Sequence, residues 1–219
     1  MSITTDYLSP AQMPEVIPVF PLAGALLLPR ARIPLNIFEP RYLAMVEDAL
    51  RGDRIIGLIQ PATEAAEVPA LLPVGCAGRL TQFAETGDGR YLVALTGIAR
   101  FRIVEEIAAA TPYRQCRVAF SGFPSDFTPC ADEEAVDRAS VLETLRQFAD
   151  ANDLQIDWQS IREAPNEALV NALSMMSPYG PREKQALLEA PSLKRRAEVL
   201  VAITEVELAR SKWAPIPLQ

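Results

Sequence analysis

The stretch "GCAGRLTQFAETGDGRYLVALTGIARFRIVEEI", residues 75–107, predicts a long β-hairpin. Residues 86–89 (Thr-Gly-Asp-Gly) supply the turn, because Asp-Gly and Gly tolerate positive backbone dihedrals. After the turn, Tyr91, Val93 and Leu95 recur at every second position, which is the period of a strand. Gly97 predicts a bend or bulge before the strand resumes over residues 100–104.

In the resumed strand, alternation places Phe101 and Ile103 on one side and Arg100 and Arg102 on the other. Further strands are predicted over residues 15–20, 25–28, 54–59 and 113–120, the third of them buried on both sides. One helix is predicted over residues 40–51, with Pro40 in its first turn. Several such strands within about a hundred residues are typical of a small barrel or curled sheet.

The second half of the chain has the period of helices instead. Asp132 is the expected cap of a first helix, whose apolar stripe comprises Val136, Ala139, Leu142, Leu145 and Phe148. A second helix is expected after Pro165, with Leu169, Val170, Leu173 and Met176 on one face. A short third helix ends near residue 188, and Ser192 caps a long last one.

These patterns predict an α+β chain in four parts. Residues 1–14 form a flexible N-terminus, and 15–122 form a β-rich lobe with one helix. Residues 123–131 form a linker rich in turn residues, and 132–212 form a helical subdomain.

The composition excludes several classes of enzyme. The 219 residues contain no histidine, and the three cysteines (Cys76, Cys116 and Cys130) form no Cys-x-x-Cys pair, so zinc has almost no ligands. Neither a phosphate-binding loop nor a dinucleotide-binding glycine motif is present. We therefore expect no catalytic, cofactor-binding or metal-binding residues, and we expect the cysteines to be reduced thiols of a cytosolic protein.

The apolar run "VIPVFPLAGALLLP", residues 16–29, is not expected to be an export signal or a membrane span. No Lys or Arg precedes it, and Pro18, Pro21 and Pro29 interrupt it. It is also shorter than the roughly 20 residues that a span needs. The run is predicted to form the first pair of barrel strands, joined by a turn over residues 21–24, of a cytoplasmic protein.

The charge differs between the two halves. Residues 1–120 contain 11 basic and 12 acidic residues, a net of −1, whereas residues 121–219 contain 10 and 16, a net of −6. The first half has all of its basic charge as arginine. The overall acidity, with a pI of about 4.8, disfavours binding to nucleic acid.

Several motifs in order resemble one family. The stretch from Phe20 to Leu50, with residues 37–42 (Ile-Phe-Glu-Pro-Arg-Tyr) before a helix, resembles the start of the N-terminal, substrate-binding domain of Lon proteases, and still more the stand-alone bacterial proteins made of that domain alone. The stretches "GCAGRL" at 75–80 and "GIARFRI" at 97–103 are similar to later strands of the family. The stretch "PYGPREKQALLEAPSLKRRAEVL" at 178–200 is similar to its helical segment.

The resemblance covers about residues 15 to 210, and it implies a PUA-like (pseudouridine-synthase-associated) pseudo-β-barrel lobe followed by a C-terminal helical bundle. It also implies binding of polypeptide without catalysis. A full Lon protease continues into an ATPase module and a Ser-Lys protease domain, and neither is expected in a chain that ends at Gln219.

Four residues are candidates for polypeptide binding. Phe123 and Phe127 lie in the linker, where no periodic stripe explains them, and Met175 and Tyr179 lie in the helical half. The two phenylalanines either tuck back onto the barrel or form an exposed patch. If they form the patch, replacing both with Ser should abolish peptide binding and leave melting unchanged. For the family-motif residues Pro34, Phe38, Pro40 and Tyr42, the sequence favours a structural role, with the aromatic side chains in the core.

Two functions of different class therefore compete. The favoured one is a non-enzymatic module that binds unfolded polypeptide or a partner protein through an apolar groove near the junction of barrel and bundle. The rival is an RNA-binding PUA-like module that uses the strand arginines Arg79, Arg90, Arg100, Arg102, Arg114 and Arg117. A small-molecule pocket would require a deep apolar cavity with a few convergent polar groups. The sequence leaves the oligomeric state and the identity of the partner open.

Overall fold

The computed structural model describes residues 7–63 and 69–213, and only the backbone of residues 211–213. It divides the chain into two compact units, residues 1–129 with 178–189 and residues 130–177 with 190–219. The strands of the described residues are β1 (Val16–Pro21), β2 (Arg32–Ile37), β3 (Ile55–Pro61), β4 (Leu71–Thr86), β5 (Arg90–Ile107) and β6 (Gln115–Ala119). The α-helices in the same part of the chain are α1 (Pro40–Arg51), α2 (Arg138–Ala151), α3 (Trp158–Glu163), α4 (Asn166–Met176), α5 (Pro181–Glu189) and α6 (Leu193–Trp213).

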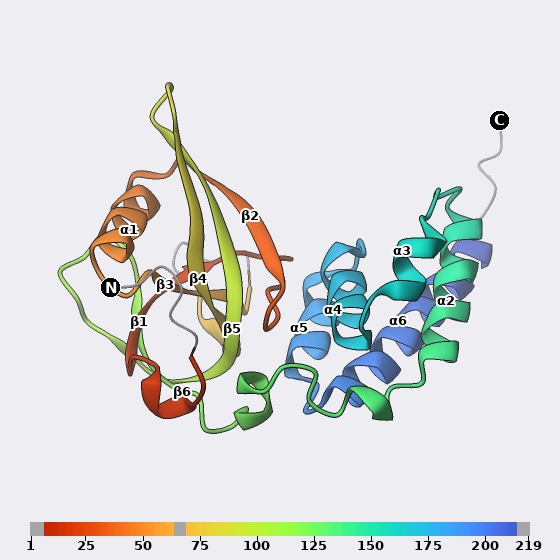
Figure 1. The fold of residues 1–219 in the computed structure, drawn as a ribbon. Coiled ribbons are helices and arrows are strands. Elements are labelled where there is room, and N and C mark those ends of the chain that lie inside the picture. Colours follow the sequence, from red (N-terminus) through yellow and green to blue (C-terminus); the bar gives the residue numbers. More distant parts are fainter. Residues whose placement is uncertain (1–6, 64–68, 214–219) are drawn as a thin grey trace. The chain divides into compact units, whose positions relative to one another are not determined.

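The strands of the first unit close into a barrel, as the PUA-like resemblance implies (Figure 1). Their order is β2-β5-β4-β3-β1-β6, and β5 also pairs with β6, which closes the ring. All neighbours are antiparallel except β1 and β3. The interior is filled by Met13, Ile17, Val19, Ile55, Ile59, Ala77, Ala99, Phe101, Cys116, Val118, Phe120 and Phe127.

The predicted hairpin is confirmed as β4 and β5, with Thr86 opposite Arg90 at its turn. The predicted bulge is confirmed at Ile98, where the register shifts by one residue. Gly97 is required there because a Cβ atom would lie 2.0 Å from the carbonyl oxygen of Leu28. This close approach also allows the Gly97 amide to donate to the Ala31 carbonyl at 2.8 Å.

The prediction for the apolar run is partly wrong. β1 forms, but residues 25–28 form no strand, although Leu26, Leu27 and Leu28 are buried. The chain turns instead at Arg30, whose φ is +64°, and the regular strand register with β5 begins at Arg32. An apolar run predicts burial well, whereas strand pairing depends on a partner that is distant in sequence.

The N-terminal part also differs from the prediction. Residues 7–14 were expected to be flexible, yet they contain a 3₁₀ turn over Pro10–Gln12, and Met13 belongs to the barrel core. Residues 1–6 lie outside the described residues.

Helix α5 belongs to the barrel unit, whereas the sequence predicted a single helical subdomain over residues 132–212. Buried Gln60 of β3 donates from its Nε2 to the Pro181 carbonyl at 2.9 Å and to the Gln185 Oε1 at 3.1 Å. The Gln185 Nε2 in turn donates to the Val74 carbonyl of β4 at 3.1 Å. Leu187 is fully buried beside this network. The Gln185 and Leu187 positions of the family motif therefore attach α5 to the barrel.

A buried ion pair lies next to the same helix. Arg100 of β5 is 2% exposed, and its guanidinium contacts the Asp126 carboxylate at 2.7 and 2.8 Å. The Asp126 carboxylate also accepts from the Arg100 backbone amide at 2.8 Å. Arg100 Nη1 donates to the Leu188 carbonyl at 3.0 Å, near the C-terminus of α5, where the helix dipole favours a cation. One side chain thus joins β5, the turn after β6 and α5.

In the second unit, three predicted helices are confirmed as α2, α4 and α6, but Asp132 does not cap α2. Asp132 has a left-handed backbone before a 3₁₀ turn over Glu133–Ala135, and the cap is Asp137, which accepts from the Ser140 amide at 3.1 Å. The predicted cap Ser192 is confirmed, since its hydroxyl accepts from the Arg195 amide at 3.2 Å. The sequence did not predict α3, which Asp157 caps.

We predict that Asp126→Ala lowers the free energy of unfolding by about 3–5 kcal/mol, because it leaves the Arg100 guanidinium buried without its counter-ion. Urea denaturation followed by circular dichroism measures the change. Glu105→Gln is the matched control, since it breaks an exposed pair with Arg117 in the same unit and should change stability by less than about 1 kcal/mol. Equal effects of the two substitutions would contradict the role given to the buried pair.

Candidate functional site

The structure places both linker phenylalanines inside the barrel unit. Phe127 is 9% exposed and packs edge-on against Phe120, with ring centroids 6.5 Å apart. Phe123 is 7% exposed and lies under the Arg100 guanidinium, 4.4 Å from it. Of the two alternatives that the sequence left open, tucking onto the barrel is the one observed.

The two remaining candidates are not prominent surface residues either. Tyr179 is buried in the first unit, and Met175 is half-buried on α4 of the second. The neighbouring Met176, expected in the core of that helix, is instead 83% exposed. The four predicted residues therefore form no exposed apolar patch.

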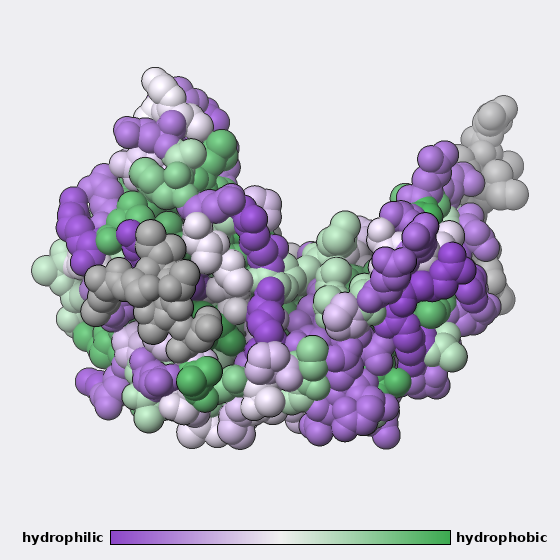
Figure 2. All heavy atoms as spheres, in the orientation of Figure 1, coloured by the Kyte–Doolittle hydropathy of each residue, from purple (hydrophilic) through white to green (hydrophobic). Residues whose placement is uncertain are grey.

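Exposed apolar side chains gather at a different place, the hairpin end of the barrel. Phe38 and Leu92 are 62% and 49% exposed, and we call these two residues the hairpin cluster. Phe83 is 41% exposed on the other face of the same sheet. Figure 2 shows apolar residues on the hairpin arms, below its hydrophilic tip. Large exposed apolar side chains close together mark interaction surfaces more often than single ones do.

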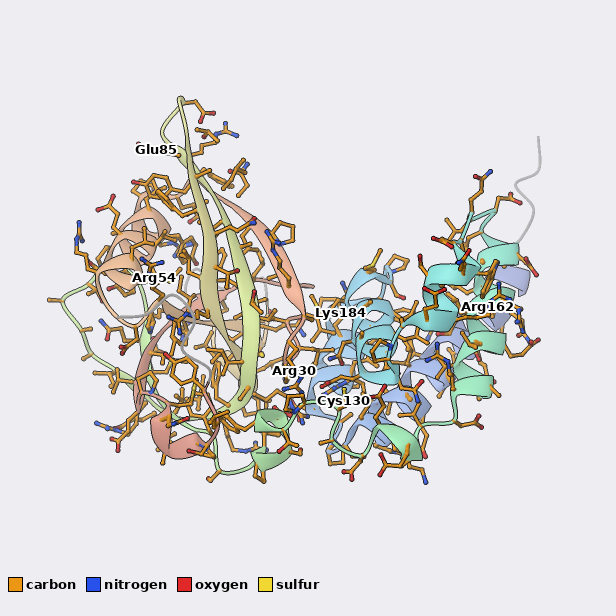
Figure 3. The ribbon with its side chains drawn as sticks, in the orientation of Figure 1. Arg30, Arg54, Glu85, Cys130, Arg162 and Lys184 are labelled. Atoms are coloured by element: carbon orange, nitrogen blue, oxygen red, sulfur yellow. The ribbon has the colours of Figure 1, made fainter. Side chains whose placement is uncertain are left out.

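The strand register explains why these residues lie at one end. Tyr91 of β5 is opposite Ile37 of β2 and Glu85 of β4, and Glu85 lies near the hairpin tip in Figure 3. Phe38 directly follows Ile37, Leu92 directly follows Tyr91, and Phe83 lies two residues before Glu85. Phe38 and Leu92 therefore come from adjacent strand ends, whereas Phe83, which is opposite Val93, leaves the sheet on the other face.

Tyr91 connects this end to α1. Its ring packs edge-on against Phe83 with centroids 4.9 Å apart, and its hydroxyl donates to Glu47 of α1 at 3.0 Å. The hydrogen bond to the Glu47 carboxylate raises the pKa of the Tyr91 hydroxyl, so it stays protonated at neutral pH. The Phe83–Tyr91 pair thus fixes the hairpin arms on the face opposite to Leu92.

Polar and charged groups surround the cluster, and those nearby are already paired. Arg32 of β2 donates to the Gln82 side chain of β4, and Arg90 pairs with Asp88 at 3.2 Å in the turn. The hydrogen bond from Thr86 lowers the pKa of the Asp88 carboxyl, which stays ionised. The surface therefore offers apolar contact next to compensated charges, which suits an apolar ligand better than an anionic one.

The strand arginines are mostly neutralised by carboxylates. Arg100 is buried against Asp126, and Arg114 and Arg117 pair with glutamates at 2.6 and 2.9 Å. Arg90 pairs with Asp88 as described. A surface that binds phosphates needs uncompensated cations, so the pairing of these arginines gives little support to the RNA-binding hypothesis.

Cavities and possible metal sites add no stronger candidate. A surface pocket of about 330 Å³ beside Arg54, which Figure 3 labels, is lined by Tyr7, Met13, Asp53 and Arg79 among others, so its walls are as polar as they are apolar. Among residues 7–63 and 69–213, no group of three His, Cys, Asp or Glu side chains could hold a metal ion. In the same part of the chain, no helix has the length and apolar character to cross a membrane.

The sequence reasoning missed the hairpin cluster, and it was wrong about Phe38, which was expected in the core. The sequence pattern that could have placed Phe38 at the surface is the alternation along β2, where Ile33, Leu35 and Ile37 are the more buried positions. Continuing that alternation places residue 38 outward. Of the other motif residues, Tyr42 is buried as predicted, whereas Pro34 and Pro40 are exposed.

We predict that replacing Phe123 and Phe127 together with Ser lowers the melting temperature by 10 °C or more, a rough estimate from the several kcal/mol that each buried aromatic ring contributes. Differential scanning calorimetry measures the change. This reverses the sequence-based expectation that melting stays unchanged, and an unaltered melting temperature would contradict the burial of both rings.

Comparisons with known proteins agree with this architecture. Residues 16–205 match the model of the ATP-dependent protease La (LON) substrate-binding domain. The chain is 28% identical to Lon protease 2 of Myxococcus xanthus and 27% identical to Lon protease of Flavobacterium johnsoniae, with 87% and 91% of this chain covered. These matches span 24% and 25% of the two relatives, so the chain corresponds to about a quarter of their length.

Two solved structures share the fold. A Lon N-terminal domain protein from Xanthomonas campestris matches with a TM-score of 0.62 and 23% identity, covering 91% of this chain and 99% of that one. The N-terminal domain of Mycobacterium avium complex Lon protease matches with a TM-score of 0.65 and 16% identity, covering 87% and 98%. With the family model matched over most of its length, the chain belongs to the family of LON substrate-binding domains.

Proposed function

We propose that this chain is a non-enzymatic module that binds unfolded polypeptide and that the hairpin cluster is its contact surface. The carrying observation is that a member of a substrate-binding family exposes Phe38 and Leu92 at one end of its barrel. Unfolded chains expose apolar side chains, and covering such side chains on both partners is favourable by about 25 cal/mol per Å².

The rigidity of the surface supports this proposal. Val93 and Ile37 are buried beneath the hairpin end, and the Tyr91 hydroxyl is fixed by Glu47. The apolar side chains therefore lie on a packed sheet, and the protein loses little conformational entropy when a ligand binds. A folded partner protein could use the same contacts, but an unfolded chain also offers the free backbone that the adjacent strand can use.

We also infer that the module works in the reducing environment of the bacterial cytoplasm. The cysteines of the described residues form no disulfide, and Cys76 and Cys116 are both buried. Burial raises the pKa of the Cys116 thiol to about 11, which keeps it protonated and unreactive at neutral pH. Free thiols are typical of reducing compartments, where disulfides are rare.

We predict that Phe38→Ser combined with Leu92→Ser weakens binding of unfolded polypeptide at least about tenfold, because it removes both apolar side chains of the hairpin cluster. The probe is fluorescein-labelled, reduced and carboxymethylated lactalbumin, and fluorescence anisotropy measures its dissociation constant. Apolar contact also predicts that the constant changes little between low and moderate salt.

Val104→Ser is the matched control, because Val104 is 60% exposed on the same strand β5 but lies outside the cluster. The control should bind as tightly as the unaltered protein. Equal binding by the cluster variant would remove the cluster from the site, and no binding by the unaltered protein would refute the proposal.

A further inference from the structure

We infer that β2 binds an extended polypeptide segment by strand addition, so that the bound segment becomes a further strand beside Arg32–Ile37. This inference rests on the proposed polypeptide-binding function and specifies the conformation of the ligand. It starts from the position of β2, which is the outermost strand of the sheet and, among the described strands, pairs with β5 alone (Figure 1).

Alternate residues of β2 form hydrogen bonds with β5, and this alternation shows which backbone groups of β2 are left free. The Gly97 amide donates to the Ala31 carbonyl, and the Gly97 carbonyl accepts from the Arg30 amide, so Gly97 bonds to the start of this strand across a bulge. The same register then continues along β2 from Arg32. In an antiparallel ladder, hydrogen-bonded and non-hydrogen-bonded pairs alternate. Ile33, Leu35 and Ile37 therefore bond to β5, and their neighbours point the other way.

The free edge consists of the backbone groups of Arg32, Pro34 and Asn36. All three residues are exposed, and no bond outside the strand ladder joins their backbones to any other part of the described chain. Proline is suited to this outward-facing position, because it has no N–H to donate to a neighbouring strand and within sheets is confined to edges. The edge thus presents two amides and three carbonyls in the pattern that an extended backbone complements.

Pro34 also makes an unrelated polypeptide a better guest than a second copy of this chain. An unrelated segment loses only the one hydrogen bond that the Pro34 nitrogen cannot donate. Two copies of β2 pairing antiparallel about their centres would set Pro34 against Pro34 and lose both central bonds. The proline therefore disfavours self-association, a common role of proline on edge strands, and leaves the edge available to an unrelated polypeptide.

The edge is continuous with the hairpin cluster. Phe38 follows the last residue of β2. Leu92 is opposite Asn36, so the Leu92 side chain leaves the sheet on the same face as the Asn36 side chain. A guest strand along β2 would reach Phe38 at its end. Backbone bonds along the edge would hold any sequence, and Phe38 would favour apolar residues, which matches a ligand recognised by being unfolded.

The test compares two substitutions at one residue. Asn36→Pro removes a free edge amide and adds a ring where the guest backbone would lie, whereas Asn36→Ala changes the side chain and keeps the amide. With labelled carboxymethylated lactalbumin, we predict that Asn36→Pro weakens binding about tenfold or more and that Asn36→Ala changes it less than about twofold.

A second measurement uses the unaltered protein and does not depend on how Asn36→Pro folds. Amide hydrogen exchange by NMR should show the Arg32 and Asn36 amides slowing on saturation with the probe, with the exposed Asp88 amide of the hairpin turn unchanged. Equal binding by both Asn36 variants, or no protection of Arg32 and Asn36 while the probe binds, would overturn strand addition and leave polypeptide binding standing.

Two further outcomes of these experiments would have different consequences. Failure of the unaltered protein to bind the probe would refute the proposed function together with this inference. Protection of the Arg32 and Asn36 amides that rises with protein concentration, without any probe, would assign the edge to a second copy and overturn the inference.

Discussion

The fold of the first unit depends on the buried pair of Arg100 and Asp126. An unpaired guanidinium at 2% exposure would be strongly unfavourable, so the carboxylate must be brought to it. The turn that carries Asp126 also carries Phe123 and Phe127, whose rings cover the cation and extend the core. The same cation takes the Leu188 carbonyl from α5. One charge therefore determines where a turn and a helix attach to the barrel.

This attachment leaves the hairpin end of the barrel uncovered. Helix α5 and the 124–127 turn contact the β4 and β5 segments that run through residues 74 and 100, whereas the hairpin arms at residues 83 and 92 are exposed. The uncovered sheet end holds the hairpin cluster, and its outermost strand has a free edge. The contact surface and the free edge thus have one structural origin, which is the length of β4 and β5 beyond the region that α5 covers.

Local pattern predicted most elements of the chain. The hairpin turn, the bulge near Gly97, the buried strand β3 and helix α1 all follow from spacing and turn residues close together in sequence. Alternation also placed Arg100 and Phe101 on opposite sides correctly. It could not show that Arg100 is buried, because the groups that cover it come from residues 126 and 188. For the same reason, the burial of Phe123 and Phe127 was left open, and the cap of α2 was placed at Asp132 instead of Asp137.

The central claim is that unfolded polypeptide is held at the hairpin end, and site-specific photocrosslinking tests it most directly. A benzoylphenylalanine placed at position 38, or at position 104 as the control, is irradiated with labelled carboxymethylated lactalbumin. The account predicts crosslinks from position 38 and few from position 104, although both positions are about 60% exposed. Equal crosslinking from both positions, or none from position 38 while the probe is bound, would contradict it.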